Sequence, residues 1–547
     1  MAGSQRRYSA STGSGSSGSS TRNPHGGART HRSADHRHWP ARVESVIPEV
    51  ASGRIDERTT LAATHTGRVA ASGAPSRRRA ATTTAERFDL VVIGGGPAGA
   101  CGANAAALFG RRVALVERAE HVGGAGINSG TVPSKTLRET ALALSGFRSR
   151  RLFGVDLSLR REATAAELMH HKDAVSDAER RQVERRMRAF GVQRFHGVGR
   201  FVDPHTIAVS SPGGTTLLHG DVILIATGSA PWRPPEFPFD DDRVHDSDQL
   251  LDIETVPKSL AVVGAGVIGA EYASTFAAIG VAVHVVDGRD TLLPFLDADA
   301  SHALEAAMVA NGVRFHWRER VERCDASRPD EIVLHLSSGA ELACEHVLVC
   351  AGRSSNVDDL DLAAAGIEAG ERGLIHVDPQ WRTAVPHIFA AGDVVGPPAL
   401  AATGMEQARA AMCHAFDIAA KDDAAPLLAT GIYTIPEAGA VGATEQALRD
   451  GGVDYIAGVA RYADLARGRI VGDDVGFLKL LFRAGDMRLL GAHAVGEHAT
   501  ELIHIALIAM MSNATADLFN RACFNYPTLG DLYKYATYDA LLTKGIE

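Results

Sequence analysis

Two short glycine-rich segments have the spacing that binds a diphosphate group. The first, residues 94–99, reads Gly-Gly-Gly-Pro-Ala-Gly, and the second, residues 264–269, reads Gly-Ala-Gly-Val-Ile-Gly. In such a loop the first Gly allows a tight turn, the second lets phosphate approach the backbone, and the third lets helix and strand pack closely. The diphosphate then lies at the N-terminus of the following helix. The pattern selects Gly94, Gly96, Gly99, Gly264, Gly266 and Gly269.

An acidic residue follows each loop at the same distance. Glu117 lies 23 residues after Gly94, and Asp287 lies 23 residues after Gly264. A carboxylate at this place accepts hydrogen bonds from a ribose diol and repels a 2′-phosphate. Glu117 therefore suits the adenosine ribose of FAD, and Asp287 alone favours NAD over NADP. Arg289 either turns inward to bind a 2′-phosphate or is a solvated surface charge.

Apolar runs and helical patterns must position these loops. The first loop follows an apolar run at residues 90–93 and precedes an Ala-rich helical pattern that ends near residue 110, before a second apolar run at 113–117. The same order of strand, turn, helix and strand recurs over residues 260–287. The sequence therefore predicts an α/β protein with two Rossmann-like dinucleotide-binding domains.

Further motifs resemble those of the pyridine nucleotide-disulphide oxidoreductases. Residues 123–135 are similar to the family's redox-active segment, and Ala-Thr-Gly-Ser at 226–229 and Ala-Gly-Arg at 351–353 resemble its strand-end turns. Phe-Ala-Ala-Gly-Asp at 389–393 resembles the second FAD motif, and Tyr-Thr-Ile-Pro-Glu at 433–437 resembles the start of the interface domain. The resemblance runs from about residue 87 to the C-terminus and implies an additional α+β dimerisation domain.

The resemblance also implies domain boundaries and cofactor contacts. The expected parts are an FAD-binding domain in two pieces, 86–254 and 353–424, an NAD(P)-binding domain at 255–352, and a dimerisation domain at 425–547. Residues 1–85 are rich in Ser, Gly, Thr, Ala and Arg and are expected to be a disordered extension, with an organelle transit peptide as the alternative. Further residues expected to contact a cofactor are Thr131, Lys135, Thr227, Gly228, Gly352 and Asp393, whose carboxylate would bind the ribityl chain.

The family's reactive dithiol is missing. Gly126 and Thr131 occupy the two cysteine positions, which lie five residues apart. Tyr526 replaces the His, and Asp531 the Glu, of the family's C-terminal acid/base pair. With neither a dithiol nor an imidazole, the chain lacks the groups for disulphide chemistry.

The combination of Gly-Thr-Val-Pro-Ser-Lys at 130–135 with Asn-Tyr-Pro-Thr at 525–528 resembles the soluble, Si-face-specific pyridine nucleotide transhydrogenases. In that branch Thr commonly fills the second Cys position and the first Cys is often kept, so Gly126 departs from it. The resemblance implies hydride transfer from NADPH to FAD and then to NAD⁺ at a shared site. Lys135 would lie near the flavin N5 edge, pair with Glu271 and stabilise the reduced flavin.

Purely structural roles remain open for several of these candidate residues. Lys135 could be a first-turn helix charge, Glu271 a helix surface acid, and Thr131 a space-filling residue beside the flavin. Tyr526 either closes the flavin site across a dimer interface or is an interface aromatic residue. The alternative functions are a quinone or dye reductase that uses NAD(P)H and a non-catalytic flavin-binding assembly subunit.

Composition and charge limit the classes of partner that the protein is expected to bind. The net charge of −9 argues against general nucleic-acid affinity, which needs clustered positive charge. The apolar stretch at 259–286 contains Glu271, which argues against a membrane span. The six cysteines have no metal-ligand spacing, so no metal is expected. We expect a cytoplasmic homodimer or higher homo-oligomer whose partners are nicotinamide dinucleotides.

Overall fold

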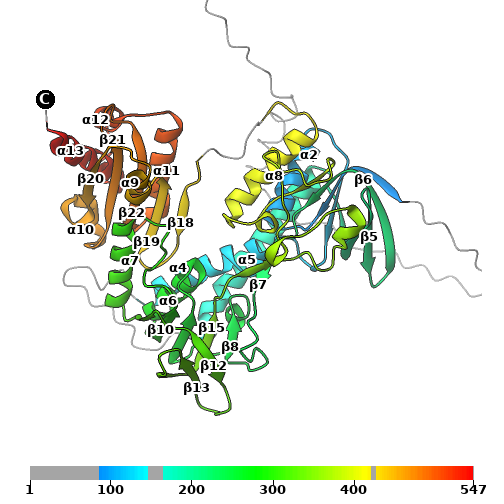
Figure 1. Ribbon diagram of the computed structural model, residues 1–547, viewed down its shortest axis with the longest axis horizontal. Coiled ribbons are helices and arrows are strands. Elements are labelled where there is room, and N and C mark those ends of the chain that lie inside the picture. Colours follow the sequence, from blue (N-terminus) through cyan, green and yellow to red (C-terminus); the bar gives the residue numbers. More distant parts are fainter. Residues whose placement is uncertain (1–84, 146–163, 421–426, 546–547) are drawn as a thin grey trace, which may run out of the picture. The chain divides into compact units, whose positions relative to one another are not determined.

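The computed structural model describes residues 85–145, 164–420 and 427–545 (Figure 1). The expected extension at 1–85 lies, except for its last residue, outside the described residues. Within these ranges no helix combines the length and apolar character that a membrane crossing requires.

The first sheet is built around the first glycine loop. Its strand order is β3-β2-β1-β6-β5-β4, with β17 also paired to β6. β1 pairs in parallel with both β2 and β6, and its apolar run from Leu90 to Ile93 is almost fully buried, as in a sheet covered on both faces. The strands are β1 (Glu86–Ile93), β2 (Val113–Glu117), β3 (Gln193–His196), β4 (Val198–Asp203), β5 (Thr206–Ser211), β6 (Gly214–Ile225) and β17 (Ile388–Ala390).

Helices around this sheet carry the first glycine loop and the redox-segment residues. α2 begins within the loop, at Pro97, and packs beside α8, which comes from much later in the chain. α4 begins at Thr131 and packs against α5, whose N-terminus has a capping box between Thr164 and Glu167. The helices are α2 (Pro97–Leu108), α3 (Gly124–Asn128), α4 (Thr131–Leu144), α5 (Ala165–Ala189) and α8 (Ala401–Ala415).

The second sheet repeats the parallel arrangement around the second glycine loop. Its strand order is β11-β10-β9-β15-β8, and each pair of neighbouring strands is parallel. α6 begins within the loop, at Val267, and a separate antiparallel sheet, β12-β13-β14, precedes β15. The elements are β8 (Val244–Asp246), β9 (Ser259–Val263), α6 (Val267–Ala278), β10 (Ala282–Asp287), α7 (Ala298–Ala310), β11 (Arg314–Trp317), β12 (Val321–Asp325), β13 (Ile332–Leu336), β14 (Glu341–Cys344) and β15 (His346–Val349).

Two observations bear on the expected boundaries. β17 follows the second unit in sequence but pairs with β6, so the first sheet is built from two separate stretches of the chain. β8 precedes the expected boundary at residue 255 but pairs with β15, so the second sheet begins earlier than the sequence indicated. β7 (Ser229–Pro231) and β16 (Arg353–Ser355) pair antiparallel between the two units.

The C-terminal part is an antiparallel sheet with helices packed on it. The strand order is β18-β19-β22-β21-β20, and α11 and α13 pack against the sheet. Tyr462, Phe482 and Tyr533 are among its fully buried side chains. The elements are β18 (Thr430–Ile432), β19 (Glu437–Gly442), α9 (Glu445–Asp450), β20 (Tyr455–Arg461), α10 (Ala466–Val471), β21 (Phe477–Arg483), β22 (Leu489–Gly496), α11 (Ala499–Met511), α12 (Ala516–Arg521) and α13 (Leu532–Lys544). The α/β architecture with two dinucleotide units and an α+β domain confirms the predicted fold class.

A histidine pair on neighbouring strands, with His245 buried and His346 partly buried, makes stability depend on pH. His245 on β8 and His346 on β15 approach within 2.9 Å, between Nε2 and Nδ1. Burial, together with repulsion from His346, lowers the pKa of His245 to about 4, and burial also lowers the pKa of His346. Since an unfolded histidine titrates near pH 6.5, the unfolded state binds more protons between these values. The free energy of unfolding therefore falls as the pH drops through this window.

Between about pH 7 and about pH 5, the free energy of unfolding should fall less in His245→Asn than in the unchanged protein. We expect the two decreases to differ by about 2 kcal/mol. Thermal unfolding at both pH values measures the difference. His302→Asn, an exposed residue on α7, is the control and should keep the original pH dependence. An unchanged dependence in His245→Asn would contradict this account.

Candidate active site

A cavity of about 440 Å³ opens at the first glycine loop. Its walls come from segments far apart in sequence, including the loop at 94–98, the 124–126 turn, the 226–230 turn and the second FAD motif at 391–393. Of the residues expected at a cofactor, those that line it are Gly94, Gly96, Glu117, Thr131, Thr227, Gly228 and Asp393. Gly99, Lys135 and Gly352 are not among the lining residues within the described chain.

The glycines of the loop are required by close backbone contacts. A Cβ atom on Gly94 would lie 2.3 Å from the backbone oxygen of Ala226, and one on Gly99 would lie 1.9 Å from the backbone oxygen of Gly94. Gly94 also has a φ of +103°, which side chains disfavour. Gly99 therefore supports the site by letting α2 pack on the loop, while Gly94 and Gly96 form the cavity wall.

Glu117 is buried at the end of β2 and holds the loop in place. Its Oε2 accepts a hydrogen bond from the backbone N–H of Gly95 at 2.7 Å, and its Oε1 accepts one from Ala119 at 2.8 Å. A carboxylate has about four acceptor positions, so two remain for a ligand.

The cavity fits a flavin dinucleotide. Thr227 Oγ1 is buried in its wall without a hydrogen-bond partner among the described residues, as expected where a ligand supplies one. A Cβ atom on Gly124 would lie 2.8 Å from the Cα of Gly96, so two backbone segments approach each other at the diphosphate end. Asp393 lines the cavity, where its carboxylate could bind a sugar hydroxyl.

A polar chain extends from Asp393 along the wall. Ser229 Oγ donates to Asp393 Oδ2 at 2.6 Å, and Arg353 Nε donates to Ser229 Oγ at 2.7 Å. Arg353 lies 4.0 Å from Asp248, which accepts a hydrogen bond from Ser129 at 3.0 Å. Burial raises the pKa of the Asp248 carboxyl.

Sequence reasoning did not select Ser229, Arg353 or Asp248 as site residues. The first two stand within the Ala-Thr-Gly-Ser and Ala-Gly-Arg motifs, so their positions offered a signal. Asp248 belongs to no such motif and lines the cavity through the fold alone.

Lys135 and Glu271 form an ion pair. Lys135 Nζ on α4 lies 2.6 Å from Glu271 Oε2 on α6, and Glu271 Oε1 accepts a hydrogen bond from the backbone N–H of Tyr433 at 2.9 Å. Lys135 Nζ also lies 5.2 Å from the centre of the Tyr433 ring, within the range of a cation–π contact. Glu271 is buried, so the surface-acid alternative is wrong. Lys135 lies one helical turn from Thr131, which reaches the cavity.

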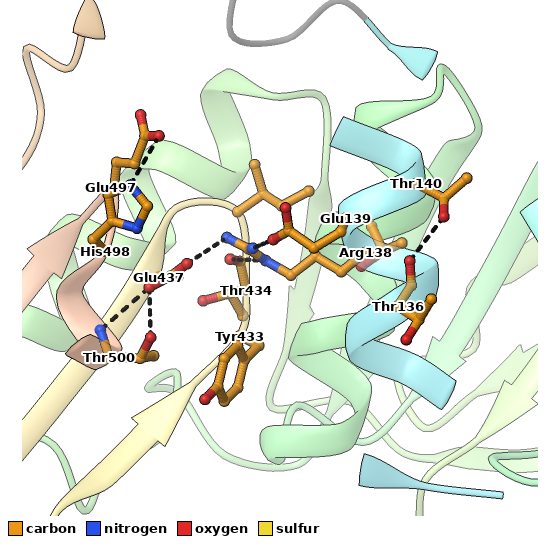
Figure 2. Close-up of polar contacts among 12 residues, drawn as sticks. Thr136, Arg138, Glu139, Thr140, Tyr433, Thr434, Glu437, Glu497, His498 and Thr500 are labelled. Carbon is orange, nitrogen blue, oxygen red and sulfur yellow. Dashed lines mark hydrogen bonds and ion pairs between the residues drawn. The ribbon is translucent and has the colours of Figure 1, made fainter. Parts of the chain in front are cut away.

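A second buried ion pair joins α4 to the C-terminal domain (Figure 2). Arg138 donates through Nε to the backbone oxygen of Thr434 at 3.0 Å and lies 3.2 Å from Glu437. The other carboxylate oxygen of Glu437 accepts a hydrogen bond from the hydroxyl of Thr500 at 2.7 Å. Arg138 and Glu437 are both nearly inaccessible to solvent. Because Arg138 lies three residues after Lys135, this pair fixes the helix that carries the lysine.

The dithiol positions contain no sulfur. Gly126 and Thr131 both line the cavity, and a Cβ atom on Gly126 would lie 2.4 Å from Cγ of Pro97. All six cysteines fall within the described residues, none of them forms a disulphide there, and none lies in the cavity lining. Among the described residues no cluster of three or more His, Cys, Asp or Glu could hold a metal ion.

The second glycine loop repeats the geometry of the first. A Cβ atom on Gly264 would lie 2.5 Å from the backbone oxygen of Cys350, and one on Gly269 would lie 1.9 Å from that of Gly264. Gly266 is the N-cap of α6. Asp287 is buried at the end of β10, where its Oδ2 accepts a hydrogen bond from the backbone N–H of Ala265 at 2.6 Å.

Arg289 turns onto Asp287. Its Nε and Nη2 donate to Oδ1 and Oδ2 at 2.8 and 2.6 Å, while 45% of the side chain stays exposed. Burial raises the pKa of Asp287, but the hydrogen bonds from Arg289 and Ala265 outweigh it and leave that pKa below its usual value. Arg289 is therefore paired with Asp287 while half exposed, and its binding of a 2′-phosphate stays a prediction.

Tyr526 and Asp531 lie apart from the flavin cavity. Neither residue is among the described residues that line the cavity, and Tyr526 is 72% exposed. Tyr526 belongs to a group of exposed large apolar side chains in the C-terminal domain, together with Ile508, Met511, Leu518, Tyr535, Tyr538 and Leu542. Such exposed apolar groups are typical of a surface that binds another protein.

Two family models match the chain. Residues 88–415 match the pyridine nucleotide-disulphide oxidoreductase model, and residues 428–537 match the dimerisation domain of the same enzymes. The chain therefore belongs to the pyridine nucleotide-disulphide oxidoreductase family, a class of FAD-dependent flavoproteins.

Similar curated proteins include soluble pyridine nucleotide transhydrogenases. The proteins of that name from Mycobacterium bovis and Colwellia psychrerythraea are 44% and 38% identical to this chain, and each match covers 83% of this chain and at least 97% of the relative. Similar solved structures are LpdA from Mycobacterium tuberculosis, with 28% identity and a TM-score of 0.76, and the flavoprotein disulfide reductase RclA from Escherichia coli, with 26% and 0.74. They cover 83% and 82% of this chain and 99% of their own.

The buried pair between Arg138 and Glu437 predicts a stability effect. In Glu437→Gln the guanidinium of Arg138 would stay buried without its buried counter-charge, so we expect a loss of about 3 kcal/mol in the free energy of unfolding. Glu139→Gln is the matched control because Glu139 also pairs with Arg138 but is half exposed; it should cost less than about 1 kcal/mol. Urea unfolding of both variants measures this, and equal losses would refute the assignment.

Proposed function

We propose that this chain catalyses FAD-dependent hydride transfer between NADPH and NAD⁺ at one nucleotide site, without a redox disulphide. The observation that carries the proposal is the pairing of an FAD cavity with a second dinucleotide loop in a chain that has Gly126 and Thr131 at the dithiol positions. The transhydrogenase relatives support the same reaction. A cytoplasmic location stays a prediction.

The chain holds each dinucleotide at a helix N-terminus. The loops before α2 and α6 offer backbone N–H groups to the diphosphates, and the buried carboxylates at the ends of β2 and β10 face the adenosine riboses. The chain would hold FAD in the cavity at the first loop, where the flavin would supply the capacity to take up and release a hydride. The protein contributes orientation and a preorganised charge.

Lys135 supplies that charge. Its ammonium group is held by Glu271 and the Tyr433 ring, so it stays cationic and oriented without reorganising during turnover. One helical turn beyond Thr131, this fixed cation would stabilise negative charge developing on a flavin bound in the cavity. Glu271 is a positioning residue because it acts through Lys135. Thr131 lies in the cavity wall, where its hydroxyl would contact the flavin but could not form the thiolate that disulphide exchange needs.

A homodimer completes the site in this proposal. The family match includes the dimerisation domain, and the exposed apolar side chains that include Tyr526 offer the contact surface. Tyr526 of a second copy would close the flavin site of the first, and Asp531 would orient that segment. The exposure of Tyr526 in the isolated chain supports this assignment.

The decisive experiment is anaerobic. NADPH added to the purified FAD-loaded protein should bleach the visible flavin absorbance, and NAD⁺ added next should restore the absorbance and form NADH, without a quinone. Steady-state rates should follow a ping-pong pattern because both dinucleotides use one site.

Other outcomes would decide against the proposal. Bleaching by NADH or NADPH with reoxidation only by a quinone or dye would establish a reductase. Absence of bleaching by either dinucleotide would favour a non-catalytic assembly subunit.

Substitution of Lys135 tests the proposed charge. Lys135→Met removes the ammonium group but keeps the length of the side chain, so flavin reduction in stopped flow should slow by about 10²-fold or more. FAD content should stay unchanged, because Lys135 does not line the cavity wall. Lys258→Met, at an exposed lysine of the second unit, is the control and should reduce at the normal rate. An unchanged rate in Lys135→Met would remove this residue from the mechanism.

A further inference from the structure

The two dinucleotide units share the backbone hydrogen bonds to their carboxylates, but a different residue stands two places after each carboxylate. In each unit the carboxylate accepts one backbone N–H from the glycine loop and one from the residue two places later, at 2.7 and 2.8 Å for Glu117 and at 2.6 and 2.9 Å for Asp287. The residue two places later is Ala119 in the first unit and Arg289 in the second. The first unit therefore serves as an internal reference for what Arg289 adds.

Arg289 fills the remaining acceptor positions of Asp287. A carboxylate accepts about four hydrogen bonds, and Asp287 receives two from backbone N–H groups and two from the guanidinium. Glu117 receives only the two backbone bonds. While Arg289 stays in this position, a ribose diol finds no free acceptor on Asp287.

The outer edge of Arg289 is available for an anion. A guanidinium has five N–H donors in a planar fork, and Asp287 uses two of them. The remaining donors belong to a side chain that is 45% exposed, and such a fork matches phosphate oxygens. Arg320 adds positive charge nearby, since its Nε lies 3.4 Å from where a Cβ atom on Gly288 would be.

We propose that Arg289 lets one site accept both dinucleotides by changing its partner. With NADP(H), Arg289 stays on Asp287, neutralises it, and binds the 2′-phosphate through its outer edge. With NAD(H), Arg289 releases Asp287, which then accepts the ribose hydroxyls. Because Arg289 is half exposed, water can solvate it after release, so the exchange costs little. The inference rests on the proposed function, which requires NADPH and NAD⁺ to use the same loop.

The test measures binding of the two adenosine fragments without a nicotinamide. Adenosine 2′,5′-bisphosphate and 5′-AMP are titrated calorimetrically into the FAD-loaded enzyme. In Arg289→Ala, which reproduces the first unit's residue, affinity for the bisphosphate should fall by about tenfold or more. Affinity for 5′-AMP should stay the same or rise, because Asp287 gains free acceptor positions.

Two further variants sharpen the test. Asp287→Asn should act in the opposite sense: it weakens 5′-AMP binding, and it maintains or strengthens bisphosphate binding because the repelling charge is gone. Arg328→Ala is the matched control, because Arg328 is likewise an exposed arginine that pairs with a nearby carboxylate, that of Glu331. This variant should change neither affinity by more than about twofold.

Equal losses of affinity for both fragments in Arg289→Ala would overturn the proposal and would indicate that Arg289 only stabilises the loop. Unchanged affinity for the bisphosphate would overturn it as well. If Arg289→Ala loses its FAD, Asp287→Asn decides by itself, and an unchanged ratio of the two affinities would refute the switch. The fragments carry no transferable hydride, so their binding does not depend on whether the unchanged enzyme transfers hydride to NAD⁺. Hydride transfer to NAD⁺ tests the proposed function separately.

Discussion

The site depends on the buried carboxylate of Glu271. One of its oxygens pairs with Lys135 of the flavin-binding part, and the other accepts the backbone N–H of Tyr433 at the start of the C-terminal domain. A buried carboxylate is costly unless both its charge and its lone pairs are satisfied. The nucleotide-binding helix α6 is therefore stable in this arrangement only when the flavin-binding part contributes Lys135 and the C-terminal domain contributes the backbone N–H of Tyr433.

The second buried pair strengthens the same constraint. Arg138 and Glu437 join α4 to the C-terminal domain one helical turn beyond Lys135. Helix α4 thus carries a residue at the cavity, Thr131, a cation beside it, Lys135, and an anchor to the interface domain. A change in the C-terminal domain can reach Lys135 through backbone and ion-pair contacts alone.

The loss of the dithiol leaves a simpler chemical site. Gly126 and Thr131 cannot exchange electrons, so the flavin is the only redox group that the chain's motifs require. Selectivity then depends on which dinucleotide the second loop accepts. The carboxylates of Glu117 and Asp287 accept the same backbone hydrogen bonds, and only Asp287 also accepts bonds from a nearby arginine. In the proposed reaction this difference separates a fixed cofactor site from a substrate site.

The sequence by itself determined the features that depend on local backbone requirements. We could predict the glycine loops, the acidic residues that follow them and the replaced dithiol positions, because each depends on residue type at a fixed short spacing. The pairing of Lys135 with Glu271 came only from resemblance, since these residues lie 136 positions apart.

Tertiary structure decided the rest. Asp248 reaches the cavity, Tyr433 reaches Lys135, and β8 joins the second sheet because long-range packing brings them there. The inward turn of Arg289 likewise depended on the folded environment: burial of Asp287 leaves a carboxylate that needs partners, and the nearby guanidinium satisfies it. Spacing along a chain specifies a turn, but burial and charge pairing are properties of the folded molecule.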